Sequence, residues 1–254
     1  MAPPSAKVRL DLLLHTRGLV SSRAQARGLI LSGSVSVQGQ TVDKAGSLVT
    51  QDAEIALRAV PAYVGRGGIK LKAALDHFHV PVEGRMVLDV GASTGGFTDC
   101  LLQHGAAGVY AIDVGYGQMA WRLRQDPRVV VIERQNIRTL PEGVIPQRLD
   151  LVVVDVSFIS LSQVMPHILP LLKETGEIIT LVKPQFEVGY GEVERGGVIR
   201  SPEKRRMALD RLCAQAPVWG LWVVGWIPSP ILGKKGNVEF LVYFRKRGEA
   251  GRIL

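Results

Sequence analysis

Hydrophobic and polar positions alternate in two different ways along the chain, and the pattern changes near residue 60. In the first part, residues 10–14 form one short apolar helix face, and residues 24–31 form another. Residues 22–25, Ser-Arg-Ala-Gln, predict a capping box at the start of the second helix. Residues 35–37 then alternate as in a half-buried strand, which a glycine turn connects to a return strand. The first part therefore reads as a small α/β unit.

Long apolar runs separated by helical segments characterise the rest of the chain. A helix that ends at about His104 is expected after the glycine-rich residues 91–97, and another over residues 159–172, whereas the glycine-rich residues 184–200 are expected to form a loop. The apolar runs predict strands at residues 86–90, 109–113, 129–132, 149–155 and 178–183. Strands that are apolar on both faces and alternate with helices are typical of a doubly wound parallel sheet, which binds its ligands beyond the carboxyl ends of the strands.

The net charge and the cysteine content limit which binding partners and which cellular compartment are expected for this protein. The net charge is +8, which favours a polyanionic partner, although a basic protein without one has the same total. Cys100 and Cys213 lie far apart and belong to no metal-binding spacing, so we expect neither a disulfide nor a metal site, and a reducing cytoplasm. No apolar run reaches the roughly 18 to 20 residues that span a bilayer, and the first residues lack the apolar stretch of a signal peptide, so no membrane partner is expected.

The first unit resembles the S4 domain of ribosomal proteins and RNA-modifying enzymes. The resemblance rests on Arg-Leu-Asp at residues 9–11, Ser-Arg-Ala-Gln-Ala-Arg at residues 22–27 and residues 33–39. It implies RNA binding by basic side chains on one side of a small core, where guanidinium groups can contact phosphates. The candidates are Arg9, Arg17, Arg23, Arg27 and Lys44. Taken alone, Arg23 and Arg27 would more often be the solvated face of a helix; the ordered set of matching residues is what favours RNA binding.

A glycine-rich turn follows the first strand of the second part. The order Asp89-x-Gly91-x-x-x-Gly95, with Asp113 at the end of the next strand, resembles the signature of S-adenosylmethionine (SAM)-dependent methyltransferases rather than that of dinucleotide-binding folds. The resemblance implies that Asp113 binds the ribose hydroxyls of SAM and that the turn surrounds its methionine part. Asn136 is either near the adenine or an ordinary turn residue. The candidate cofactor residues are Asp89, Gly91, Ser93, Thr94, Gly95, Phe97, Asp113 and Asn136.

Four charged residues at strand ends and cleft edges are the candidate catalytic set. They are Lys70, Asp155, Lys183 and Glu239. A ribose 2′-hydroxyl is a very weak acid, so its methylation needs a group that takes or steers its proton, a role that a lysine oriented by a carboxylate can perform. Each of the four could singly be an ordinary surface charge; the joint pattern is what indicates chemistry.

The Lys-Asp-Lys-Glu order resembles that of the FtsJ-related ribose 2′-O-methyltransferases. The sequence segments that flank the four residues, together with the S4-like N-terminal unit, resemble the TlyA family, whose older name is haemolysin-like. The resemblance implies a Rossmann-like SAM-dependent methyltransferase domain after a small α/β S4 domain, and a cytidine ribose of ribosomal RNA, in the large subunit and in some members also the small one, as the substrate. We hypothesise that Lys183 accepts or steers the proton, Asp155 orients it, and Lys70 with Glu239 positions the ribose. The expected domains are residues 1–60 for the S4 domain, 61–64 for a linker and 65–254 for the FtsJ-like domain.

Several rival functions are open to a chain with these features. Base N-methylation usually needs the tetrapeptide Asn/Asp-Pro-Pro-aromatic at the end of the fourth strand. Residues 155–158 at that place are Asp-Val-Ser-Phe, which argues against base N-methylation. A pore-forming haemolysin would need a membrane-inserting segment, and the hydropathy pattern offers none. An S4 RNA-binding protein with a non-catalytic SAM fold remains open, and titration with SAM would separate it from an enzyme. The sequence predicts no oligomeric state.

Overall fold

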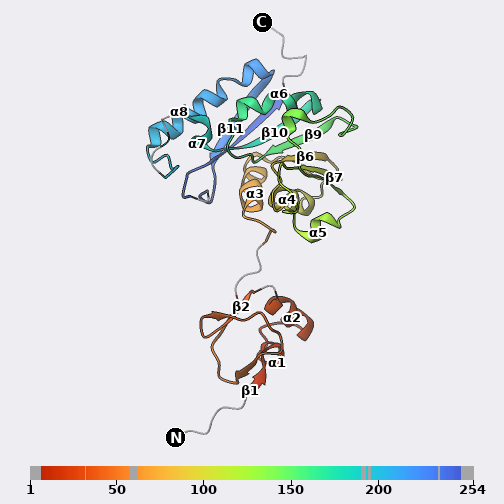
Figure 1. Ribbon diagram of the computed structural model, residues 1–254, viewed down its shortest axis with the longest axis vertical. Coiled ribbons are helices and arrows are strands. Elements are labelled where there is room, and N and C mark those ends of the chain that lie inside the picture. The colour runs from red at the N-terminus through yellow and green to blue at the C-terminus, as the bar shows by residue number, and fades with distance from the viewer. Residues whose placement is uncertain are drawn as a thin grey trace. The chain divides into compact units, whose positions relative to one another are not determined.

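The chain divides into two compact units, residues 1–61 (the front unit) and residues 62–254 (the large unit). The computed structural model describes residues 7–31, 33–57, 62–189, 193, 196–233 and 235–246 (Figure 1). The first residue of the expected linker, Pro61, lies outside the described residues. Each unit has a hydrophobic core of its own.

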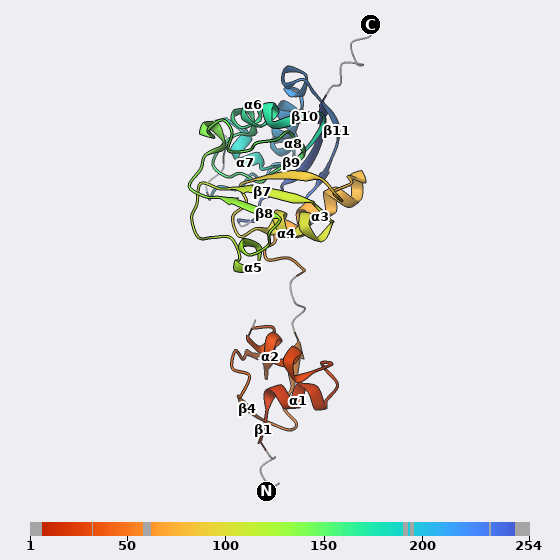
Figure 2. The same cartoon turned by 90° about the vertical axis from the view of Figure 1, so that its right-hand side faces the viewer.

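The front unit packs two helices against short antiparallel strands (Figure 2). Its elements are β1 (Lys7–Arg9), α1 (Leu10–Thr16), α2 (Arg23–Leu31), β2 (Val35–Val37), β3 (Gln40–Thr41), β4 (Leu48–Thr50) and β5 (Ile55–Leu57). β1 pairs with β4, and β2 lies between β3 and β5. The predicted cap of α2 is confirmed in part: Ser22 Oγ accepts from the backbone N–H of Gln25 at 3.2 Å, but the Gln25 side chain accepts from Ser21 instead of Ser22.

The large unit is built on a seven-stranded sheet. Its strands are β6 (Met86–Val90), β7 (Gly108–Ile112), β8 (Val129–Ile132), β9 (Leu149–Val154), β10 (Leu172–Val182), β11 (Leu221–Pro228) and β12 (Phe240–Lys246). Its α-helices are α3 (Gly67–Phe78), α4 (Gly96–Gln103), α5 (Trp121–Arg124), α6 (Met165–Ile168), α7 (Pro184–Glu187) and α8 (Pro202–Cys213). Its 3-10 turns are η1 (Ile137–Thr139), η2 (Leu161–Gln163), η3 (Leu169–Leu171) and η4 (Ala216–Trp219).

The strand order is β11-β12-β10-β9-β6-β7-β8, with α3 and α4 on one side of the sheet and α6 and α8 on the other (Figure 1). The five strands from β6 to β10 are parallel, as predicted, but β12 runs antiparallel between β10 and β11. Val182 at the end of β10 therefore pairs with Phe240 at the start of β12. This reversal brings the residues that precede β12 to the carboxyl edge of the parallel strands, where ligands of such sheets bind.

Two predicted segments differ from the structure. The helix expected over residues 159–172 is confirmed only in part: the segment is helical, but as the three short pieces η2, α6 and η3 rather than as one helix. Pro166 and Pro170 explain the break, because each lacks the backbone N–H that a continuous helix would use. The loop expected over residues 184–200 begins with the short helix α7, whose first residue is Pro184. Among the described residues, no helix is long and apolar enough to cross a membrane.

Candidate active site

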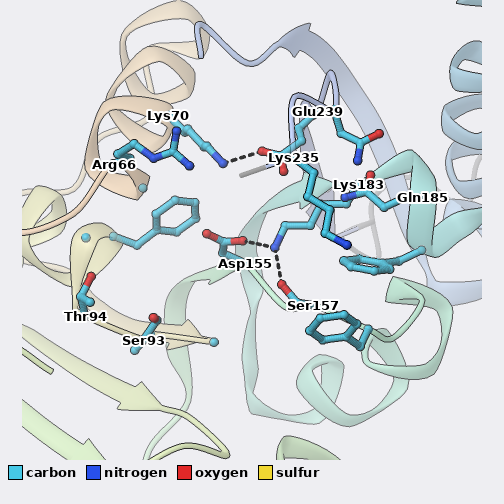
Figure 3. Close-up of a pocket in the computed structure, with 18 of the residues that line it drawn as sticks. Arg66, Lys70, Ser93, Thr94, Asp155, Ser157, Lys183, Gln185, Lys235 and Glu239 are labelled. Carbon is cyan, nitrogen blue, oxygen red and sulfur yellow. Dashed lines mark hydrogen bonds and ion pairs between the residues drawn. The ribbon is translucent and has the colours of Figure 1, made fainter. Parts of the chain in front are cut away.

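A cavity of about 520 Å³ opens at the carboxyl edge of the sheet (Figure 3). Its walls come from α3, from the turn after β6, from the ends of β9 and β10, and from the residues before β12. All four members of the candidate catalytic set line it, namely Lys70, Asp155, Lys183 and Glu239. The volume is in the range of pockets that hold cofactor-sized ligands.

Lys183 and Asp155 form an ion pair on one side of the cavity. They follow the adjacent strands β10 and β9, so parallel pairing brings them to the same edge. Lys183 Nζ lies 2.6 Å from Asp155 Oδ1 and donates to Ser157 Oγ at 2.9 Å (Figure 3). It also donates to the Val156 carbonyl at 2.8 Å. The Lys183 side chain is buried, and two hydrogen-bond acceptors and one ion-paired carboxylate fix the position of its amine in the cavity.

Lys70 and Glu239 form a second ion pair across the cavity. Lys70 projects from α3 and Glu239 precedes β12, 169 residues later, yet Lys70 Nζ donates to Glu239 Oε2 (Figure 3). Their side chains are 8% and 4% exposed, so neither is the solvated surface charge that each could have been in isolation. A buried pair of this kind is costly to break, because removal of one partner leaves an uncompensated charge.

The glycine-rich turn forms the floor of the other half of the cavity. Gly91 and Gly95 have φ values of +87° and +91°, which a side chain would strain. A Cβ atom on Gly91 would also lie 2.5 Å from the backbone oxygen of Asp155, so only glycine lets the turn pass this close to the end of β9. Of the candidate cofactor residues, those that line the cavity are Gly91, Ser93, Thr94 and Phe97.

The other candidate cofactor residues lie behind or beside the lining, among them Gly95. Asp113 Oδ2 accepts from the backbone N–H of Ser93 at 2.8 Å, so this carboxylate is tied to the turn. Asp89 is fully buried and accepts from the N–H and hydroxyl of Thr98, at 3.0 and 2.7 Å, which anchors the first turn of α4. Burial raises the pKa of Asp89 to about 7. Asn136 accepts from the backbone N–H of Arg138 at 3.0 Å, as a turn residue does.

Sequence reasoning gave no role to several side chains that line the cavity. These are Arg66, Ser157, Phe158, Gln185, Phe186 and Lys235. Phe158 is 91% exposed and has a φ of +64°, which is unusual for an aromatic residue and marks a constrained loop. Arg66 and Lys235 have no ion-pair partner among the residues that the structure describes. No periodic pattern distinguishes these positions, although several stand beside residues of the candidate set.

In the front unit, three of the predicted RNA-binding arginines converge on one carboxylate. Arg9, Arg23 and Arg27 contact Asp11 at 2.9, 3.0 and 3.2 Å. The Asp11 side chain is fully buried, whereas those of the arginines are 46, 47 and 55% exposed. Hydrogen bonding from the Arg9 guanidinium, with help from the other two, holds the pKa of Asp11 well below its usual range. The cluster therefore presents three fixed guanidinium groups at the surface.

The other two RNA-binding candidates are placed differently. The Arg17 guanidinium donates to the backbone carbonyls of Ala53, at 2.7 Å, and Gln51, and so ties the end of α1 to the turn between β4 and β5. The Lys44 side chain is exposed, without a side-chain partner among the described residues. In the part of the chain that the structure describes, no three His, Cys, Asp or Glu side chains form a group that could hold a metal ion.

Comparison with known proteins agrees with this division of the chain. Residues 8–55 match the S4 domain family, and residues 63–246 match the FtsJ-like methyltransferase family. The fold is also similar to that of a SAM-dependent methyltransferase structure from Listeria monocytogenes, with a TM-score of 0.53 and 16% identity over 72% of this chain and 99% of that one. At this low identity the likeness shows the fold alone.

Closer relatives cover nearly the whole chain. The 16S/23S rRNA (cytidine-2′-O)-methyltransferase TlyA of Mycobacterium tuberculosis is 46% identical over 94% of this chain and 90% of its own length. Hemolysin A of Brachyspira hyodysenteriae is 41% identical over 93% of this chain and 99% of its own. A solved hemolysin-named structure from Streptococcus thermophilus matches with a TM-score of 0.72 and 40% identity, over 94% of this chain and 88% of that one. The chain therefore belongs to the FtsJ-like methyltransferase family and, within it, to the S4-fronted TlyA proteins.

Proposed function

We propose that this protein transfers a methyl group from SAM to the ribose 2′-hydroxyl of a cytidine in ribosomal RNA. The observation that carries the proposal is the meeting of two buried lysine–carboxylate pairs, Lys183 with Asp155 and Lys70 with Glu239, in one cavity beside a glycine-rich turn. Cytidine and ribosomal RNA come from the TlyA relative, whose name states both. We assign RNA binding to residues 1–60 and methyl transfer to residues 65–254.

The half of the cavity lined by the turn suits SAM. Gly91, Ser93, Thr94 and Phe97 offer backbone groups and one ring at its surface. The carboxylate of Asp113, one strand away, has an unused lone pair on each oxygen and could accept from ribose hydroxyls. Asp89 would support this half indirectly by anchoring α4. SAM supplies an electrophilic methyl group on a sulfonium centre when it is bound.

The half of the cavity around Lys183 suits the ribose. As an ammonium, Lys183 has three N–H groups: the Val156 carbonyl and Ser157 accept from it, and Asp155 Oδ1 lies 2.6 Å away in an ion pair. The incoming 2′-hydroxyl would take the place of Ser157, which is neutral and free to turn away, whereas the carboxylate holds its position. An ammonium has no lone pair, so in this form Lys183 steers the reaction: it donates to the 2′-oxygen and stabilises the negative charge that develops there as this oxygen bonds to the methyl carbon, while the hydroxyl proton passes to solvent. Lys70 and Glu239 position the ribose from the opposite wall.

The front unit supports an RNA substrate. Three half-exposed guanidinium groups on a fixed carboxylate can contact phosphates without first being ordered. The net charge of +8 would strengthen attraction to ribosomal RNA or to ribosomal subunits in the cytoplasm.

Comparison of ribosomal RNA from cells with and without the gene tests this proposal. Mass mapping, or primer extension at low nucleotide concentration, should detect a 2′-O-methylcytidine that is present only in cells with the gene. Restoration of the mark by the intact gene, together with SAM binding by the purified protein, would complete the case. The proposal would be refuted if, for the RNA of both ribosomal subunits, the modification map were the same in cells with and without the gene. A site in both the 16S and 23S RNA, rather than one, would extend the substrate to both subunits.

A further inference from the structure

Gln185 has a buried amide oxygen that nothing in the described part of the protein satisfies. It lies in α7, two residues after Lys183, and its side chain lines the same cavity (Figure 3). Its Oε1 atom is shielded from solvent and has no hydrogen-bond partner. A buried acceptor without a donor costs about 1 to 3 kcal/mol, and native proteins rarely keep one without a reason.

The backbone of the short helix that carries Gln185 is fixed, so only a turn about the bonds of its side chain is needed to bring Oε1 to the cavity that this side chain lines. The Glu187 carboxylate accepts from the Ser160 hydroxyl at 2.6 Å and from the backbone N–H of Leu161 at 2.9 Å. The backbone N–H of Phe186 donates to the Lys183 carbonyl at 2.8 Å. These bonds tie α7 both to the loop after β9 and to the end of β10. A polar group held in this way is prepared for a ligand.

Two aromatic rings flank this part of the cavity. Phe158 and Phe186 both line it, with ring centroids 5.2 Å apart. Flat apolar surfaces of this kind suit a nucleobase turned out of its stack. This part of the cavity therefore offers aromatic rings on which a base can stack and one unsatisfied acceptor for the polar edge of that base. It also contains Lys183, which we assign to the adjoining ribose.

We infer that Gln185 recognises the target base, with Oε1 accepting a hydrogen bond from the exocyclic amino group of cytosine. This inference rests on the proposed function. An acceptor without a donor matches cytosine, whose edge carries an amino donor at C4, and mismatches uracil, which carries an acceptor oxygen there. The amide N–H₂ group would at the same time face the N3 acceptor of cytosine, which gives the two-point contact that an amide side chain can make with a base edge. Gln185 is thus a specificity-determining residue.

A double-substitution cycle between the side chain and the base tests the inference. The RNA is a ribosomal fragment that contains the mapped target, with either cytidine or its analogue pyrimidin-2-one riboside, which lacks only the amino group. For the wild-type protein we expect kcat/KM to be about 10-fold to 100-fold higher on cytidine. For Gln185→Leu the cytidine value should fall to that of the analogue, so that the ratio approaches one. SAM affinity, measured by titration calorimetry, should be unchanged.

Two further variants separate recognition from folding. Gln185→Glu keeps an acceptor oxygen of the same reach, so it should retain the preference for the amino group even if its overall rate falls. Gln125→Leu makes the same chemical change at an exposed position outside the cavity and should behave as wild type. Equal losses on both nucleosides in Gln185→Leu, or an unchanged preference, would overturn the inference while leaving the proposed function intact. No transfer by the wild-type protein to any of these RNAs would overturn both.

Discussion

In the front unit three guanidinium groups share one buried carboxylate, whereas in the cavity of the large unit each buried lysine has a carboxylate of its own. The Asp11 cluster keeps a net charge of +2 at a half-exposed surface. The two lysine–carboxylate pairs are neutral as pairs and are largely closed to solvent. The difference separates two uses of basic residues: an excess of exposed charge attracts a polyanion, and matched buried charge can hold a proton in place for a reaction.

Loss of Lys183 should produce the largest effect, and it should be confined to the chemistry. With Lys183→Ala we expect methyl transfer to fall by about 100-fold to 10,000-fold, the usual contribution of a positioned acid–base group. SAM and RNA should still bind, because the turn and the Asp11 cluster are untouched. The measurement is single-turnover transfer of labelled methyl to ribosomal subunits that lack the modification.

The same two strands offer a matched control for Lys183. Lys173 pairs with Asp150 at 2.6 Å on β10 and β9, at the opposite end from Lys183 and Asp155, and its side chain is half exposed. Surface pairs of this kind contribute little. Lys173→Ala should therefore leave transfer unchanged, and comparable losses in both variants would mean that Lys183 acts through the fold rather than on the substrate.

The stability of the two units should depend on pH in opposite directions. The pKa of Asp89 is raised to about 7 by burial, so the folded large unit keeps this proton at pH values where the unfolded chain has lost it. Its stability should therefore fall as pH rises from about 4 to 7. The pKa of Asp11 is lowered, so the front unit should hold its stability above about pH 4 and lose it below, as this carboxylate takes up a proton.

Tryptophan fluorescence can follow one unit alone, since all four tryptophans lie in the large unit. Denaturation monitored in this way should give a stability that falls from pH 5 to pH 7, and Asp89→Asn should flatten this slope by up to a few kcal/mol. Hydrogen exchange of front-unit amides supplies the other half of the comparison. A slope of the same size in Asp89→Asn would show that other groups cause it.

Removal of Asp11 should convert the ordered arginine cluster into three mutually repelling cations. With Asp11→Ala we expect RNA affinity to fall about tenfold, because the guanidinium groups must then be ordered at the moment of binding. The thermal midpoint of the front unit should also fall by roughly 5 °C or more, as charge-assisted hydrogen bonds to a buried group are lost. Asp43→Ala, an exposed aspartate in the same unit, is the control. Retained affinity would mean that the cluster does not contact RNA.

The sequence indicated which four charged residues lie together in the cavity better than it indicated what surrounds them. Asp155 and Lys183 end apolar strands, and parallel strands that neighbour each other must bring such residues together. Glu239 was harder to place, because its position depends on the antiparallel course of β12, which no local pattern reveals. Gln185 and Lys235 carry no periodic signal at all, since their importance arises only from a cavity that distant segments form.

The front unit shows the same limit on a smaller scale. Arg23 and Arg27 are four residues apart, which is enough to place them on one helix face, and both contact one partner. The shared carboxylate was not evident, because Asp11 belongs to a different helix and looks like an ordinary polar position in an apolar stretch. The role of Arg17 as a tether between segments likewise depends on backbone carbonyls, which a sequence does not locate.

The smallest expected effect comes from the difference between Arg27, which belongs to the Asp11 cluster, and Arg17, which ties two backbone segments together. If the Asp11 cluster meets phosphates, Arg27→Ala should lower the slope of log affinity against log salt concentration by about one, with a several-fold loss of affinity at 100 mM salt. Arg17→Ala should leave that slope unchanged and instead lower the thermal stability of the front unit, since its guanidinium is already bound to two carbonyls.

Lys44→Ala removes an exposed cation outside the cluster, so the salt slope of this variant shows whether the RNA-binding surface extends beyond the Asp11 cluster. Binding of a ribosomal RNA fragment followed by fluorescence anisotropy from about 50 to 200 mM salt gives all three values. Equal slope changes for Arg17 and Arg27 would mean that RNA displaces the tether, and the front unit would then rearrange on binding instead of presenting a ready-made surface.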